Sequence, residues 1–406
     1  MPRRVALLVA LALAACSPTP PIAESPSPKP TETALATAAA TATLAAASPS
    51  AVAPASGISA NALGPLTGNW IFFPQWVPNA ANTRARLEVW GIAPNDQQRL
   101  AFSYEVSLGG VPEAMIDNAP YLRRQFSPDG RQIAVSTLSD GLVVVDLVSG
   151  QTRGLGTAGF FPSWSKDGKT IAYINDVAHA DPQRGVQDHA IWVVPAAGGT
   201  PRELVNVGSS STSPEWSGDS RLLMAQLADG VGLVDVASGR EVPGGRIPFA
   251  LTTTGAHWPG GSARATVTLI RRDDTQIVMY DDAARVTGFL QQFARPHESG
   301  PGLVPRDPRW NPTGNGEVLF VLLDEKANRT EADVLDTHSG QRSRIVGDVE
   351  QATWSSDGTK IVYVARVQQG LPGAVRVYDR ITGTDRELVA RMGPNNYRPS
   401  IVSVAY

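Results

Sequence analysis

The pentapeptide Trp354-Ser-Ser-Asp-Gly358 decides the fold, because versions of it recur along the chain. Each version places an aromatic residue before a turn tetrapeptide, and an apolar run follows. The other five are Phe126–Gly130, Trp164–Gly168, Trp216–Ser220, Trp258–Ser262 and Trp310–Gly314. The Ser-x-Asp-Gly form favours a tight turn, because Asp accepts hydrogen bonds within its own turn and Gly adopts a positive φ.

The apolar runs behind these turns predict β-strands, since they are rich in β-branched residues. A further run often ends in Asp before a Gly-containing turn, as in Leu142–Gly150, Val231–Gly239 and Val375–Gly383. A repeat of about forty residues with four short strands cannot bury both of its faces alone, so successive repeats must pack around a common axis. The sequence therefore predicts an all-β fold, a β-propeller of four-stranded blades. The tryptophans then form the core between blades, rather than a platform on which sugars stack.

This repeat resembles that of WD-type and TolB-like propellers, and the resemblance covers residues 63–406. Two of the six versions, Trp258–Ser262 and Trp310–Gly314, depart from the aromatic-Ser-x-Asp-Gly form. TolB binds envelope lipoproteins and peptidic segments, so the resemblance implies a binding or scaffolding role in the cell envelope. The chain differs from TolB in having a low-complexity segment where TolB has an α/β domain.

The two ends of the repeat region predict one further blade. Three strands, Asn69–Phe73, Leu87–Ile92 and Gln98–Phe102, have no aromatic-turn motif before them, and residues 397–406 form a lone last strand. Pairing the last strand with the first three would close the ring and remove its open edge. We expect seven blades, with six as the alternative if the first segment is only a cap.

The N-terminus predicts a lipoprotein. Arg3 and Arg4 precede a short apolar run, and Cys16, the only cysteine, follows Leu13-Ala-Ala15. This resembles a bacterial lipobox, which implies a signal peptide over residues 1–15, a lipidated Cys16 and anchoring at the extracytoplasmic side of a membrane, in the periplasm or at the cell surface. An ordinary signal peptide is the alternative. Residues 16–62 are mostly Ala, Thr, Ser and Pro and predict a disordered tether.

The lengths of the connections predict a binding face. We define the short-turn face by the connections from first to second and third to fourth strand, and the long-loop face by the other connections. Most of the longer segments belong to the second class: Pro74–Arg84, Ser103–Pro120, Asp176–Asp188, Gln291–Asp307, Asp324–Ala332 and Gln368–Gly373. Long loops are often functional, so we expect the long-loop face to bind. We also expect the tether to join on the short-turn face, so that the long-loop face points away from the membrane.

One of these loops supplies candidate binding residues, namely His179, Asp181, Asp188 and His189. Such side chains can ligate a divalent metal, but they are also ordinary in a solvated loop, and we expect neither a metal nor a cofactor. The single cysteine excludes an intramolecular disulfide and any multi-thiolate zinc site.

The net charge and the sequence motifs restrict the possible classes of function. A net charge of −3 argues against nucleic acid as a partner. The chain has no Gly-x-Ser-x-Gly elbow. We therefore expect a monomeric, non-catalytic module that binds an envelope protein or peptide and reaches the membrane through its lipid only. Two alternatives stay open: a glycan or peptidoglycan binder, and an enzyme such as a lyase or metal-dependent hydrolase with acidic residues at the central channel.

Overall fold

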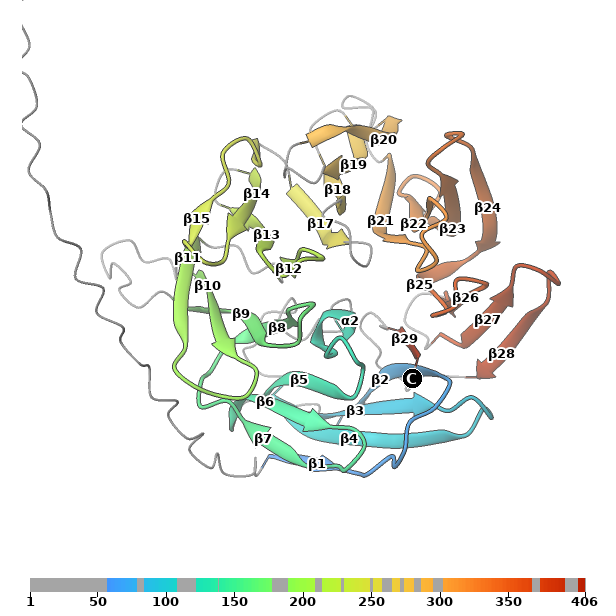
Figure 1. Cartoon of the computed structure of the whole chain (residues 1–406). Helices are drawn as coiled ribbons and strands as arrows, with labels where there is room; N and C mark the ends of the chain where they lie inside the picture. The colour runs from blue at the N-terminus through green and yellow to red at the C-terminus, as the bar shows by residue number, and fades with distance from the viewer. Residues whose placement is uncertain are drawn as a thin grey trace, which may run out of the picture. The chain divides into compact units, whose positions relative to one another are not determined.

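The computed structural model describes residues 57–78, 84–107, 122–137, 139–176, 189–208, 214–227, 230–248, 251–257, 265–270, 274–280, 286–294, 302–366, 373–390 and 401–405. All of them belong to one compact unit, residues 49–406. Their strands form seven antiparallel sheets that follow one another around a common axis (Figure 1). The predicted all-β propeller with four-stranded blades is confirmed.

We number the sheets 1 to 7 along the chain. Sheet 1 contains β1 (Ile58–Ala60), β2 (Asn69–Pro78), β3 (Arg84–Ile92), β4 (Gln98–Ser107) and β29 (Val402–Ala405). Sheet 2 contains β5 (Gln132–Thr137), β6 (Gly141–Asp146) and β7 (Thr152–Gly154). Sheet 3 contains β8 (Phe160–Trp164), β9 (Thr170–Asp176), β10 (His189–Pro195) and β11 (Arg202–Gly208). Sheet 4 contains β12 (Glu215–Trp216), β13 (Leu222–Leu227), β14 (Gly230–Asp235), β15 (Arg240–Glu241) and β16 (Ile247–Pro248).

The last three sheets have four strands each in simple order. Sheet 5 contains β17 (Leu251–His257), β18 (Ala265–Ile270), β19 (Asp274–Tyr280) and β20 (Val286–Ala294). Sheet 6 contains β21 (Leu303–Trp310), β22 (Glu317–Asp324), β23 (Arg329–Asp336) and β24 (Arg342–Gly347). Sheet 7 contains β25 (Val349–Trp354), β26 (Lys360–Ala365), β27 (Val375–Asp379) and β28 (Asp385–Val389).

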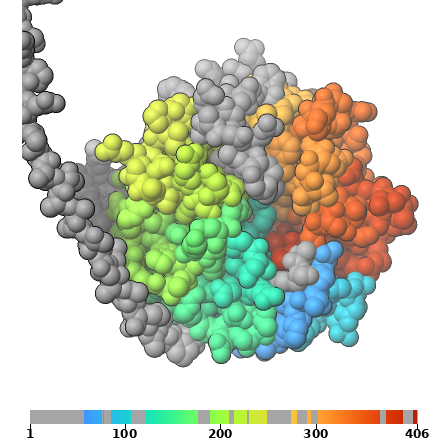
Figure 2. Space-filling view, in the orientation of Figure 1, coloured from blue at the N-terminus to red at the C-terminus, as the bar shows by residue number. Residues whose placement is uncertain are grey.

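The last strand of the chain joins the first sheet, as the sequence predicts. Strand β29 pairs with β2, with Val402 opposite Phe72 and Val404 opposite Trp70. In the space-filling view the N-terminal part of the propeller, in blue, lies beside the C-terminal part, in red (Figure 2). Buried apolar side chains of sheets 1 and 7, among them Ile92 and Val362, share one core cluster. The two ends of the propeller are therefore joined by strand pairing and by packing.

Sheet 2 departs from the regular pattern at its inner edge. A short helix, α2 (Leu122–Gln125), stands where the other sheets have a first strand, and only Phe126 makes a β-bridge, to Ile133. The helix lies at the inner edge of sheet 2, towards the middle of the ring (Figure 1), and it contains Arg123 and Arg124.

Strand β1 corrects the predicted tether. We expected residues 16–62 to lie outside the propeller, but Ile58–Ala60 pairs with the outer edge of β4. The physical reason is that Ile58 and Ala60 pack against the core of sheets 1 and 2. The propeller therefore begins within the segment assigned to the tether.

The side on which the chain enters the propeller is also corrected. Gly57, the first described residue, donates its N–H to Asp140 Oδ2 at 2.8 Å. Asp140 lies in the turn between β5 and β6, the second and third strand positions of sheet 2, and so on the long-loop face. The chain then runs along β1, and the Leu63 N–H bonds to Leu147 O beside the next turn. The entry is on the long-loop face, opposite to the expected side.

The recurring turns have the predicted chemistry. In the Trp354 motif the Ser355 hydroxyl donates to Asp357 Oδ1 at 2.5 Å, and Asp357 Oδ1 also accepts the Thr359 N–H at 3.0 Å. The same pair of bonds forms around Asp129, Asp167 and Asp219. Because these carboxylates are engaged inside their own turns, they serve the fold.

Three of the motif tryptophans lie in the core, as we expected, and a fourth, Trp310, is half-buried. Trp164, Trp216 and Trp354 are at most 4% exposed. The indole N–H of Trp216 donates to the carbonyl of Ser163 in the preceding sheet at 2.9 Å. A sugar could not stack on rings buried in this way. Trp258 lies outside the described residues.

The expected long loops divide into two groups. The connection assigned to Asp324–Ala332 is a tight hairpin, because β22 and β23 keep their register through Asp324 and Arg329. The segment Pro74–Arg84 is partly strand, since β2 extends to Pro78. Residues 108–121, 177–188, 295–301 and 367–372 of the other loops lie outside the described ranges. In the described part of the chain, no helix combines the length and apolar character needed to cross a bilayer.

Candidate functional site

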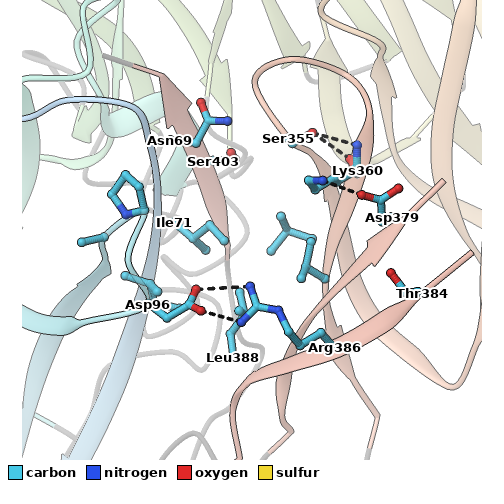
Figure 3. A pocket seen from close by; sticks show the side chains of 15 residues that line it. Asn69, Ile71, Asp96, Ser355, Lys360, Asp379, Thr384, Arg386, Leu388 and Ser403 are labelled. Atoms are coloured by element: carbon cyan, nitrogen blue, oxygen red, sulfur yellow. Dashed lines mark hydrogen bonds and ion pairs between the residues drawn. The ribbon is translucent and has the colours of Figure 1, made fainter. Parts of the chain in front are cut away.

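A cavity of about 440 Å³ lies between sheets 1 and 7, where the two ends of the propeller meet (Figure 3). Its floor is apolar, because alternate residues of the neighbouring strands direct aliphatic side chains into the gap. These side chains are Ile71, Ile92, Val362, Val377 and Leu388. An apolar cavity with a few polar groups around it is the usual form of a ligand site.

An ion pair joins the two sheets at the rim of this cavity. Arg386 of β28 donates from Nη1 to Asp96 Oδ2 at 2.6 Å and from Nη2 to Asp96 Oδ1 at 3.2 Å (Figure 3). The two side chains are 57% and 49% exposed, so this pair contributes little to stability. Its two-pronged geometry nevertheless fixes the position of both groups at the rim.

A second ion pair lies on the sheet 7 side of the rim. Lys360 Nζ donates to Asp379 Oδ2 at 2.5 Å. The hydrogen bond from Lys360, with the Thr382 and Ile381 N–H groups, lowers the pKa of Asp379 from its ordinary value to about 2. Ser355, Thr384, Asn69 and Ser403 add hydroxyl and amide groups (Figure 3). The cavity can therefore hold an apolar group of a ligand. The polar side chains at its rim can form hydrogen bonds with polar atoms next to that apolar group.

The cavity opens on the short-turn face. Its lining includes Pro94 and Asp96, in the turn between β3 and β4, and Asp379 and Thr384, which flank the turn between β27 and β28. Both are connections from third to fourth strand. The cavity is thus on the face opposite to the predicted binding face, and opposite to the face on which the described chain enters the propeller.

The binding residues predicted from the sequence are only partly described. His189 is the first residue of β10 and is 9% exposed, paired in the ladders with Asp176 of β9 and Gly208 of β11. His179, Asp181 and Asp188 lie outside the described residues, and so does Cys16. Across the described ranges, no group of three or more His, Cys, Asp and Glu side chains could hold a metal ion. The predicted loop site stays a prediction.

Comparison with known proteins identifies the fold. The periplasmic gluconolactonase PpgL of Pseudomonas aeruginosa is 16% identical, with a TM-score of 0.51, over 83% of this chain and 99% of that one. An oligogalacturonate lyase in complex with manganese is 13% identical, with a TM-score of 0.50, over 80% and 86%. TolB from Acinetobacter baumannii is 16% identical, with a TM-score of 0.46, over 82% of this chain and 66% of that one. No family model and no curated protein matches the sequence.

The comparisons overturn one expectation. We expected a non-catalytic protein, but the solved structures that share the fold include a lyase and a lactonase. The absence of a Gly-x-Ser-x-Gly motif was therefore too weak a basis for expecting a non-catalytic protein, because the same fold also occurs in enzymes. At these identities the likeness defines the class of fold, a β-propeller.

Proposed function

We propose that this chain is a lipid-anchored binding protein of the bacterial cell envelope that recognises a protein or peptide partner. The signal-like residues 1–15, the cysteine at position 16 and the tether behind it support the anchoring. The cavity between sheets 1 and 7 supports the binding, and its apolar floor beneath a polar rim is the observation that carries the proposal.

The cavity matches the needs of protein recognition. Binding energy in protein interfaces is concentrated in a few side chains that fill pockets, with polar groups around them. One large apolar side chain of a partner fits the floor formed by Val362, Val377 and Leu388. The exposed carboxylate of Asp96 can then accept a hydrogen bond from a backbone N–H of the partner. The exposed guanidinium of Arg386 can donate one to a backbone carbonyl beside the same side chain.

We further propose that the seven sheets are seven blades of a ring that β29 closes. The pairing of β29 with β2 and the cluster shared by sheets 1 and 7 support this. The cavity then lies at the closing junction, so its shape depends on the closure.

Photocrosslinking in intact cells tests the binding site. A photoreactive amino acid at Thr384, on the rim, should give one protein adduct on illumination. Val377→Trp fills the cavity and should abolish that adduct. Ile381→Trp is the matched control, because Ile381 is 80% exposed in the adjoining turn, and it should leave the adduct unchanged. No adduct at Thr384, or an adduct that persists in Val377→Trp, would overturn the proposal.

A further inference from the structure

A second group of polar side chains lies at the inner edge of the ring, apart from the cavity. Helix α2 carries Arg123 and Arg124, and the turn after β8 carries Lys166. Glu215 lies in β12 and Arg309 in β21, each directly before a motif tryptophan. These elements are the innermost parts of sheets 2, 3, 4 and 6 (Figure 1). We call these five residues, with Asp307, the axial cluster.

The two carboxylates of the axial cluster are already paired. Glu215 Oε2 forms an ion pair with Arg124 Nε, and both side chains are at most 3% exposed. Glu215 Oε1 is also 3.4 Å from Arg123 Nη2. Asp307 Oδ2 accepts from Arg309 Nε at 2.8 Å, and the Arg309 side chain is 3% exposed. The four basic groups outnumber the two acidic ones, so the cluster has a surplus of positive charge.

The surplus positive charge lies on Lys166 and on the Nη1 end of Arg309, whose Nε is paired with Asp307. Within the described ranges, Lys166 has no ion pair or hydrogen bond, and Arg309 Nη1 is buried with no acceptor. The Lys166 side chain is exposed, but the surrounding protein still desolvates it and lowers its pKa from the ordinary 10.5; the charge of Glu215 opposes this shift, and the charges of Arg123 and Arg124 add to it. Burial likewise lowers the pKa of Arg309; the charge of Asp307 opposes this shift, and the charge of Arg123 adds to it.

Without a bound anion, the surplus positive charge of the axial cluster is unfavourable for the folded state. Confined cations that lack counter-charges raise the free energy of the folded state, and a bound anion would offset that cost. The chain as a whole has a net charge of −3, so the positive surplus is local to the axis. Planar guanidinium groups and an ammonium group are the usual donors to carboxylate and phosphate oxygens.

We propose that the axial cluster binds an oxyanion, the carboxylate or phosphate group of a ligand that enters along the axis from the short-turn face. Lys166 lies in a first-to-second strand turn and therefore stands at that entrance. Lys166 and Arg123 meet the anion first, and Arg309 Nη1 donates to it at the inner end. The axial cluster shares no residue with the lining of the cavity, so a test of this anion site is independent of the test of the proposed function.

Titration calorimetry on the purified propeller-containing chain, at constant ionic strength, tests the site. Inorganic phosphate and malonate are the probes, and the anion that binds identifies which oxyanion the site prefers. Lys166→Gln should raise the Kd at least tenfold, and Lys166→Arg should restore binding. Lys169→Gln is the matched control, because Lys169 lies in the same turn with its side chain 81% exposed, and it should leave the Kd unchanged.

Three results would overturn the proposal. Neither probe binds the wild-type chain, or Lys166→Gln binds as tightly as wild type, or Lys169→Gln weakens binding as much as Lys166→Gln. The last result would mean that the probes sense only the general charge of the surface. Lys166 is exposed, so its substitution should leave the fold intact, and an unchanged Tm verifies this.

Discussion

The indole N–H of Trp354 in sheet 7 donates a hydrogen bond to the carbonyl oxygen of Arg309 in sheet 6, at 3.0 Å. The backbone of Arg309 is thus fixed by the neighbouring sheet, while its guanidinium belongs to the axial cluster. Trp216 makes the equivalent bond to Ser163 O between sheets 4 and 3. The tryptophans of the repeat therefore join consecutive sheets and also hold the inner strands that surround the axis.

Trp354→Phe should destabilise the propeller by about 1 to 3 kcal/mol, because it leaves the buried Arg309 carbonyl without its donor and removes part of a packed ring. Urea denaturation, monitored by circular dichroism, measures the change in the free energy of unfolding. Trp216→Phe should cost a similar amount, since its geometry is the same. Free energies of unfolding equal to wild type in both variants would mean that these bonds do not join the sheets.

The ion pair between Arg380 and Glu317 makes the same two sheets sensitive to acid. Arg380 donates to Glu317 Oε2 at 2.7 Å and Oε1 at 2.6 Å, and these bonds lower the pKa of Glu317 from its ordinary 4.5. A lowered carboxyl pKa gives stability that is complete above pH 4.5 and is lost as the pH falls through the folded value.

Glu317→Gln should therefore lose less of its Tm than wild type when the pH falls from 5 to 3, and it should be less stable than wild type at pH 7. Thermal melts across this range measure both effects. Glu350→Gln is a suitable control, because Glu350 Oε2 lies 3.9 Å from Arg366 Nε, a looser ion pair than the 2.6 Å contact between Glu317 and Arg380. Parallel Tm curves for wild type and Glu317→Gln would contradict the prediction.

The features that the sequence predicts well are local. Each Ser-x-Asp-Gly turn is closed by hydrogen bonds between residues close in sequence, such as Ser355 and Asp357. Five residues of sequence are therefore enough to predict it. The repetition of that turn then implies sheets around an axis. Strand β1 escaped prediction because the three residues Ile58-Ser-Ala60 adjoin the low-complexity tether, and their pairing with β4 and packing against sheets 1 and 2 involve residues distant in the sequence.

The two candidate sites depend on contacts between distant residues. Asp96 and Arg386 form the rim of the cavity although 290 positions separate them, and no local pattern indicates such a pair. The axial cluster had a usable signal, because Glu215 and Arg309 occupy the position directly before the motif tryptophan. A charged residue repeated at an inner-strand position in different blades indicates convergence at the axis. His179 and Asp188 attracted attention through residue type alone.

Cys16→Ser tests the lipid anchor. If Cys16 is acylated, the wild-type protein should incorporate radiolabelled palmitate and sediment with membranes, and the variant should do neither, because one side chain carries the whole attachment. Ser17→Ala is the matched control, since it changes the neighbouring residue and leaves the cysteine. A Cys16→Ser protein that still sediments with membranes would contradict anchoring by lipid alone.

Asp333 should make the propeller less stable as the pH rises from about 4 to 6. It lies inside β23 with 0% exposure, neither carboxyl oxygen accepts a hydrogen bond from the described residues, and Arg342 Nε is 3.4 Å from its Oδ2. Burial, with the charge of Glu331, raises its pKa from 3.8 to about 6. The folded state then holds a proton that the unfolded state has released, so stability falls with rising pH across this interval.

Asp333→Asn should remove that decline and stabilise the protein at pH 7 by about 1 to 3 kcal/mol, the range that a shift of this size implies. The free energy of unfolding in urea, measured at intervals from pH 4 to 7, checks the slope and the gain together. Asp336→Asn is the control from the same strand, because hydrogen bonds from Ser339 and His338 lower the pKa of Asp336. That substitution should leave the decline in place, so a decline that persists in Asp333→Asn would assign it to another group.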